Sequence, residues 1–138
     1  PWTGAAISPD DAGPLADDWS TRLSDSAQPT IVVVEKVAEW ADSTAEYSLE
    51  GLLKVASRSG ALVVSDGEAA TFSARYGLGA PANAARVGFL LQPDHGDGQA
   101  FGADLPRRLN RASFPPGRGF LARGGRISLG HLALVDGA

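Results

Sequence analysis

The chain has 138 residues, 43% of them hydrophobic and 20% charged, a balance typical of a single globular domain. Cysteine is absent, which excludes disulfides and thiolate metal sites, and only His95 and His131 offer imidazole. No apolar run approaches the roughly 20 residues of a membrane helix, and no signal-peptide pattern is present. Because the sequence starts at Pro1 and contains no methionine, we expect a piece of a longer or processed protein.

The net charge of −4 hides an asymmetry along the chain. Residues 1–50 contain ten acidic residues against Arg22 and Lys36, whereas residues 105–138 contain six arginines against Asp136. Such a polarity is typical of a surface that meets an acidic partner or a phosphate, and also of solvated loops and strand edges. The sequence has no basic stripe interleaved with aromatic residues, so we do not expect this segment to contact DNA directly.

The first half of the chain predicts helix, strand and helix. Residues 9–24 have apolar positions at helical spacing, after Ser8 as N-cap. Residues 31–34 form a β-branched run without polar alternation, which predicts a central parallel strand that is covered on both faces. A second helix is expected to start with a capping box and to end at Gly60. The capping pair is Ser43 with Glu46, and the predicted buried stripe is Ala45, Leu49, Leu52, Leu53 and Ala56.

The second half continues the alternation. Residues 61–64 predict another buried strand, residues 68–76 a third helix, and residues 87–91 a third strand. A loop-rich stretch over 92–119 leads to a β-hairpin around Gly124 and Gly125. The whole order predicts an α/β fold with a mostly parallel sheet flanked by helices and a C-terminal β-hairpin.

Polar residues stand where the predicted parallel strands end. Glu35 and Lys36 follow the first strand, Ser65 and Asp66 follow the second, and residues 92–94 follow the third. Ligands of open parallel sheets bind beyond the carboxyl ends of the strands, so these groups fit a magnesium–nucleotide site. They also fit ordinary strand termination, because loops need polar residues. The tract 94–98, Asp-His-Gly-Asp-Gly, is likewise either a metal loop or a polar turn.

Several segments carry a resemblance to a known family. The main ones are the run Ile31–Lys36, the run 88–94 (GFLLQPD) and the run 114–121 (FPPGRGFL). Residues 2–4, 59–68, 101–102 and 105–107 add to it. Together they resemble the C-terminal part of FtsK/SpoIIIE-family ATPase modules, particularly the last module of actinobacterial members and of the EccC ATPases of type VII secretion. The likeness covers nearly the whole chain. It implies that residues 1–138 are the C-terminal part of a RecA-like P-loop NTPase module whose Walker A half is absent here.

The chain departs from the family at the nucleotide site. The Walker A motif, which supplies the phosphate-binding nest and lysine, does not occur in it. Glu35 matches the magnesium-side acid of Walker B, whereas Lys36 matches the catalytic acid. An ammonium group cannot polarise the attacking water, and losing a positioned general base typically costs about 10²–10⁴-fold in rate. The resemblance therefore implies ATP and magnesium in the parent module, a degenerate Walker B, and no cofactor for this chain alone.

By the same resemblance, Glu35, Ser65, Asp66 and Arg118 are the nucleotide-proximal candidates, with Glu35 on the magnesium side. Arg118 stands between two glycines after two prolines, so a preset turn presents it. It is placed to reach a nucleotide or a neighbouring subunit, as arginines do at ring interfaces. The same residues also make a purely structural turn into the last hairpin.

The favoured hypothesis is a non-catalytic segment that serves subunit packing or substrate docking in a translocation or secretion motor. Its implied partners are the upstream half of the module, neighbouring ATPase modules or subunits, and signal segments of secreted proteins. The parent is expected to be membrane-anchored, with this segment on the cytoplasmic side. Part of an active DNA translocase module and a stand-alone α/β protein-binding domain are the alternatives. Three tryptophans are candidates for a cargo groove, although core packing explains Trp19: Trp2, Trp19 and Trp40.

Overall fold

The protein is represented by a computed structural model that describes residues 8–25, 28–74 and 76–133. The chain divides into two compact units. One comprises the residues up to Gly67 together with 76–81, and the other comprises 68–75 and the residues from Ala82 onward. The first unit has a two-stranded parallel sheet and the second a three-stranded antiparallel sheet. The predicted α/β class is confirmed, whereas the prediction of a mostly parallel sheet is wrong.

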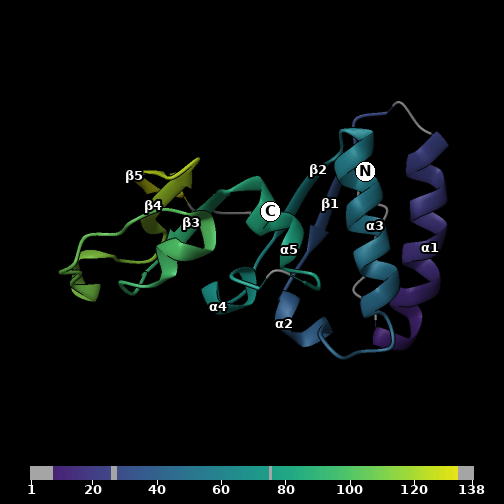
Figure 1. Ribbon diagram of the computed structural model, residues 1–138, viewed down its shortest axis with the longest axis horizontal. Coiled ribbons are helices and arrows are strands. Elements are labelled where there is room, and N and C mark those ends of the chain that lie inside the picture. Colours follow the sequence, from purple (N-terminus) through teal and green to yellow (C-terminus); the bar gives the residue numbers. More distant parts are fainter. Residues whose placement is uncertain (1–7, 26–27, 75, 134–138) are drawn as a thin grey trace. The chain divides into compact units, whose positions relative to one another are not determined.

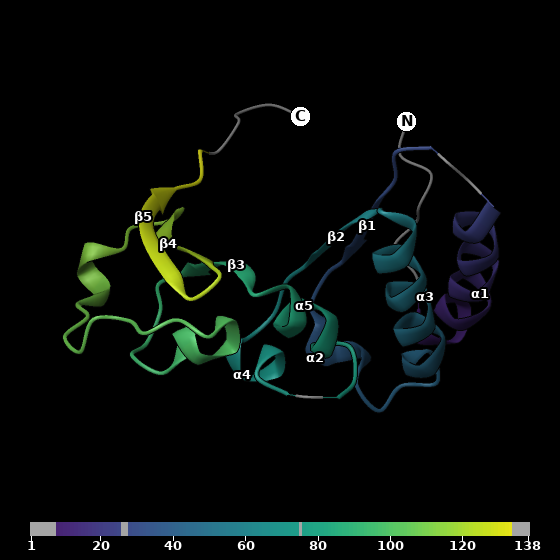
Figure 2. The same cartoon turned by 45° about the horizontal axis from the view of Figure 1, so that its top comes forward.

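Two long helices form the outer part of the first unit (Figure 1). Helix α1 (Pro9–Asp25) lies beside α3 (Glu46–Ser59), and α3 lies between α1 and the strands in both ribbon views (Figure 2). Gly13 is buried where the helices approach, and its ideal Cβ position is 3.9 Å from Ala45 Cα. The whole predicted stripe of α3 is buried, including Leu53 at 1% exposure. This part of the sequence prediction is confirmed.

The parallel sheet of the first unit pairs β1 (Ile31–Val34) with β2 (Leu62–Ser65). Strand β2 packs on α3, and Val34 is buried. The alternate positions of both strands point to the other face and are between 42% and 63% exposed: Ile31, Val33, Leu62 and Val64. The predicted parallel pairing is confirmed, but the prediction that both sheet faces are covered is wrong.

The helix boundaries of the first unit are set by local hydrogen bonds. Gly60 ends α3 in the left-handed conformation (φ 79°), as the sequence predicts. The predicted capping box is wrong, because the Glu46 carboxylate accepts the backbone N–H of Asp42 at 2.8 Å instead of that of Ser43. The Ser43 hydroxyl donates to the Trp40 carbonyl at 2.6 Å. This bond ties the end of α2 (Val37–Trp40), a short helix that the sequence does not reveal, to the start of α3.

The antiparallel sheet of the second unit has the order β3–β4–β5. Its strands are β3 (Val87–Leu91), β4 (Arg118–Arg123) and β5 (Arg126–His131). The turn between β4 and β5 consists of Gly124 (φ 55°) and Gly125 (φ 79°), and two positive φ angles are typical of a type I′ hairpin. The predicted C-terminal hairpin is confirmed, but β3 joins this hairpin rather than the parallel sheet.

Glycines let aromatic rings lie close to both faces of this sheet. Phe101, at the end of η1 (Asp97–Phe101), lies over Gly88, where a Cβ would be 2.2 Å from the ring. On the opposite face, the ring of Phe89 lies close to Gly119 and Gly130. A residue with a side chain at any of these glycines would meet the ring. These ring–glycine contacts across β3, β4 and β5 are compatible with their antiparallel pairing.

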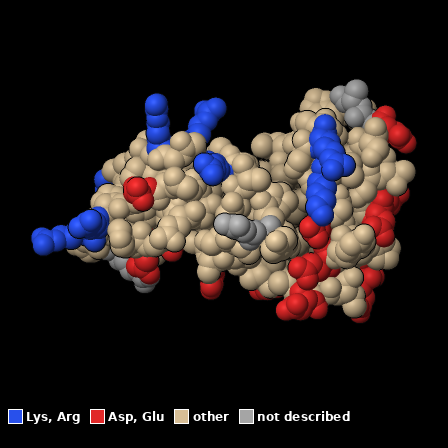
Figure 3. Space-filling model, viewed as in Figure 1, with Lys and Arg blue, Asp and Glu red and all other residues tan. Residues whose placement is uncertain are grey.

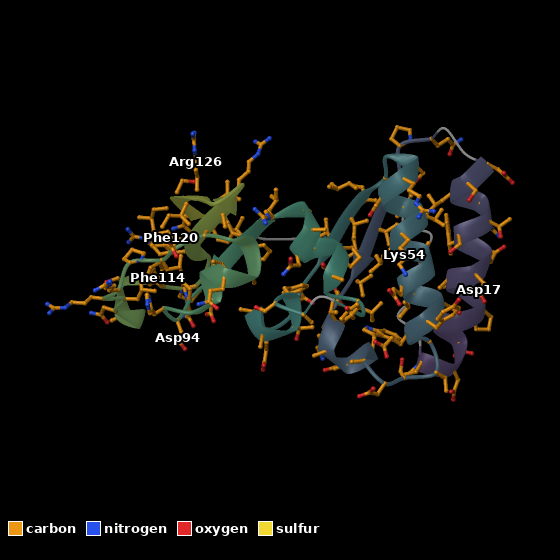
Figure 4. The ribbon with its side chains drawn as sticks, viewed as in Figure 1. Asp17, Lys54, Asp94, Phe114, Phe120 and Arg126 are labelled. Carbon is orange, nitrogen blue, oxygen red and sulfur yellow. The ribbon has the colours of Figure 1, made fainter. Side chains whose placement is uncertain are left out.

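Aromatic contacts and short helices complete the second unit. Phe114 packs edge-on against Phe120 of β4, with ring centroids 5.3 Å apart (Figure 4). Phe72, at the end of α4 (Ala69–Phe72), stacks on Phe101 at 6.4 Å. The remaining short helices are α5 (Ala80–Ala85), which spans the division between the units, and η2 (Arg111–Ser113). Among the described residues, no helix has both the length and the apolar character needed to cross a bilayer.

Candidate functional site

The parallel pairing brings two of the predicted strand ends together. Val34, the last residue of β1, lies opposite Ser65, the last residue of β2. Glu35 and Lys36 therefore leave the sheet beside Asp66. Four of the five candidate residues, Glu35, Lys36, Ser65 and Asp66, thus lie at one sheet end, as expected for parallel strands.

Asp66 holds the backbone of the neighbouring strand in place. Its side-chain Oδ1 accepts the backbone N–H of Lys36, and its carbonyl accepts the N–H of Val37 at 3.0 Å. Its own N–H donates to the Val34 carbonyl at 3.2 Å. Lys36 has a left-handed backbone (φ 51°, ψ 55°), a conformation that costs a non-glycine residue roughly 1–2 kcal/mol. The bonds from Asp66 therefore stabilise the turn from β1 into α2.

The side chains at this strand end form local contacts. The Lys36 ammonium lies 3.2 Å from the Glu39 carboxylate, and both side chains are largely exposed. The indole N–H of Trp40 donates to the Glu35 carbonyl at 2.9 Å, so Trp40 closes the first turn after the strand. An exposed ion pair contributes only about 0–1 kcal/mol. The cluster is therefore explained as the structural end of a strand.

The donor set does not fit a magnesium–nucleotide site. Magnesium takes six oxygen ligands in near-ideal octahedral geometry, some of them waters. Here one Asp66 oxygen already accepts a backbone N–H, and the residue that follows Glu35 is the cation Lys36, whose ammonium pairs with Glu39. Within the described parts of the chain, no group of three or more His, Asp or Glu side chains is placed to share a metal ion. We therefore derive no chemical step that involves magnesium or ATP at this strand end.

Arg118, the fifth candidate, belongs to the second unit. Its backbone N–H donates to the Pro115 carbonyl at 2.9 Å, and Gly117 has φ 82°. Pro at the second position and a positive-φ Gly at the third are typical of a type II turn. The Gly117 carbonyl accepts the Leu132 N–H at 2.7 Å, which fastens this turn to the end of β5. The structural explanation of the Pro-Pro-Gly-Arg-Gly segment is thus supported by its hydrogen bonds.

The other sequence candidates occupy structural positions. The Asp97 carboxylate accepts the Asp94 N–H at 2.8 Å, and the Asp94 carbonyl accepts the Asp97 N–H at 3.1 Å. The tract 94–98 is therefore a hydrogen-bonded polar turn at the start of η1. His131 is exposed on β5, and its Nε2 lies 3.1 Å from the Pro116 carbonyl oxygen, which accepts its hydrogen bond.

The tryptophans are also explained locally. Trp19 is only half-buried on α1, so the core packing expected for it is partial, and the Arg22 guanidinium lies 5.3 Å from the centre of its ring. A cation over an aromatic face is a stabilising surface contact. Trp40 is half-buried and hydrogen-bonded as described above, and Trp2 lies outside the described residues.

The sequence does not reveal the exposed apolar side chains on the two sheets. Exposed aliphatic side chains occur on β1 and β2, and again on β3 and β4. A strand with one exposed face is normally predicted from alternating apolar and polar residues. These strands are apolar at both the buried and the exposed positions, so the sequence does not distinguish the two faces. The charge asymmetry, in contrast, is visible on the surface, where acidic side chains gather on the first unit beside one stripe of basic side chains, and basic side chains project from the second unit (Figure 3).

Comparisons of this chain with known protein families, with curated proteins and with solved structures gave no match. Two features of the described residues bear on function. At the end of β1, the side chain of Asp66 is hydrogen-bonded to the backbone of Lys36. On both sheets, aliphatic side chains are exposed. The first bears on catalysis and the second on binding.

Replacing Asp66 by alanine is expected to lower the free energy of unfolding of the first unit by about 1 kcal/mol, because the Lys36 N–H loses its acceptor. Asp66→Asn retains an acceptor oxygen and should restore most of the loss. Glu35→Ala removes a carboxylate from the same strand end and should have little effect. Urea unfolding followed by tryptophan fluorescence measures all three, and equal losses for Asp66→Ala and Glu35→Ala would show that Asp66 has no special structural role.

Proposed function

We propose that this chain is a non-catalytic docking segment of an FtsK/SpoIIIE-type translocation or secretion ATPase. The observation that carries the proposal is the end of β1, where the position of the second Walker B acid is taken by Lys36. Lys36 has a left-handed backbone whose N–H donates to the Asp66 carboxylate, and its ammonium group pairs with Glu39. A site that activates water needs an acceptor at this position. The strand end therefore supports a structural role.

The docking part of the proposal is supported by the exposed apolar faces of the two sheets. Exposed groups of aliphatic side chains are typical of surfaces that bind a protein. In this proposal the partners are the upstream half of the module, neighbouring ATPase modules or subunits, and signal segments of secreted proteins. The parent protein is membrane-anchored, with this segment on the cytoplasmic side and without direct contact to DNA.

A titration with a fluorescent ATP analogue and magnesium tests the non-catalytic assignment. We expect no saturable binding to the chain up to roughly millimolar concentration, because the sequence contains no Walker A motif to bind the phosphates. The variant Lys36→Glu should behave in the same way, since restoring one acid does not create a phosphate site. Micromolar binding by the unmodified chain would contradict the proposal. Binding by Lys36→Glu alone would show that Lys36 is the single defect.

A further inference from the structure

The antiparallel sheet of the second unit has one face that, among its described residues, remains largely exposed. On the covered face, Phe101 lies over Gly88, and Phe114 contacts Phe120. Residues directly opposite each other in antiparallel strands point to the same face. The register therefore places seven side chains together on the other face, which we term the open face: Val87, Phe89, Leu91, Leu121, Arg123, Arg126 and Ser128.

The centre of the open face is apolar. Val87, Leu91 and Leu121 are each between 40% and 52% exposed. Phe89 stands opposite Leu121, and its ring lies within 2.9 Å of the ideal Cβ positions of both Gly119 and Gly130. Since these two positions carry no side chain, the ring occupies their space. The face thus presents aliphatic groups on either side of an aromatic ring.

One end of the open face is strongly basic. Arg123 and Arg126 are directly opposite each other in the hairpin, and both are exposed. Arg126 projects away from the sheet (Figure 4). None of the ion pairs formed within the described residues includes either arginine. Like charges placed directly opposite in a sheet are destabilising. An anionic group bound between these arginines would relieve that repulsion.

We propose that the open face binds an acidic amphipathic protein segment. Its carboxylates pair with Arg123 and Arg126, and its aliphatic side chains cover Leu121 and its neighbours. The planar guanidinium forks match carboxylates bidentately. Nucleic acid is disfavoured because bases need aromatic platforms for stacking, whereas the exposed groups here are mainly aliphatic. The inference rests on the docking role proposed above and specifies its surface and partner chemistry.

A direct test uses a fluorescein-labelled synthetic helical peptide composed of glutamate and leucine, with all leucines on one face. Two comparison probes separate the contributions: the same peptide with glutamine in place of leucine, and a single-stranded oligonucleotide of equal charge. We expect the glutamate–leucine peptide to bind saturably, and to bind at least about tenfold more tightly than either comparison probe. Its affinity should fall with added salt, since exposed charges are screened.

Variants of the chain locate the binding surface. The double variant Arg123→Ser/Arg126→Ser should weaken binding by about tenfold, and Leu121→Ser by a similar factor. The matched charge control is Arg107→Ser/Arg108→Ser, which removes two exposed arginines from the loop before η2. The matched apolar control is Leu129→Ser, which alters an exposed leucine on the opposite face of the sheet. Circular dichroism confirms that each variant is folded.

Three outcomes would overturn the inference: no saturable binding of the glutamate–leucine peptide, equal losses in the test and control variants, or tighter binding of the oligonucleotide. Failure here is distinguishable from failure of the proposed function. The peptide reports on the open face of the second unit, whereas the nucleotide titration reports on the strand end of the first.

Discussion

Replacing Leu53 by alanine is expected to lower the free energy of unfolding of the first unit by about 3 kcal/mol. Leu53 lies on the buried stripe of α3 and is 1% exposed. Truncation removes apolar contacts and leaves a cavity among neighbours that relax only partly. Urea unfolding followed by tryptophan fluorescence is a suitable measurement, because Trp19 and Trp40 both belong to this unit.

The matched control for Leu53 is Leu62→Ala. Leu62 is the first residue of β2 and is 58% exposed on the uncovered face of the parallel sheet. Since most of this side chain is already in water, we expect a loss below about 1 kcal/mol. A loss at Leu62 as large as that at Leu53 would show that the face is covered in solution and would contradict the described burial.

Replacing Gly119 by alanine is expected to destabilise the second unit by about 3 kcal/mol, at the upper end of the range for overpacked positions. An added Cβ would lie 2.1 Å from the Leu90 carbonyl oxygen and 2.9 Å from the Phe89 ring. The oxygen belongs to the backbone of the paired strand, so it cannot move aside without breaking the β3–β4 register. Amide hydrogen exchange of β3 and β4 measures the loss strand by strand.

The control for Gly119 is Gly96→Ala. Gly96 has an ordinary backbone conformation (φ −82°), and nothing lies within 4 Å of its ideal Cβ position. This substitution should leave exchange in β3 and β4 unchanged. If Gly119→Ala were equally silent, the close approach of β3 to β4 at this position would be incorrect.

Much of the fold could be predicted from the sequence because local signals agree with the tertiary structure. The stripe of α3 follows helical spacing, Gly60 supplies the left-handed residue that ends the helix, and the Gly124-Gly125 pair predicts its hairpin. The partner of β3 could not be predicted in this way. Its apolar run does not distinguish parallel from antiparallel pairing, which depends on Phe101 and Phe89 meeting glycines distant in sequence.

The sequence predicted where the candidate site residues lie, but not the hydrogen bonds that they form. Parallel pairing of two strands is enough to bring Glu35 and Lys36 beside Asp66. The sequence predicts parallel strands here, and the structure has them. The function of Asp66 depends on the left-handed turn at Lys36, and no sequence signal marks a lysine in that conformation. For Arg118, the prolines and glycines predict a turn, and the structure adds its hydrogen bonds to β5.

We propose that the end of β1 is structural and does not bind a magnesium–nucleotide complex. The most direct measurement is an amide NMR titration of the chain with magnesium and ATP, observing Glu35, Lys36, Ser65 and Asp66. We predict that these four resonances remain unchanged through roughly millimolar nucleotide, because the Asp66 carboxylate accepts the Lys36 N–H and the sequence contains no Walker A motif. Saturable shifts confined to these four residues would contradict the account.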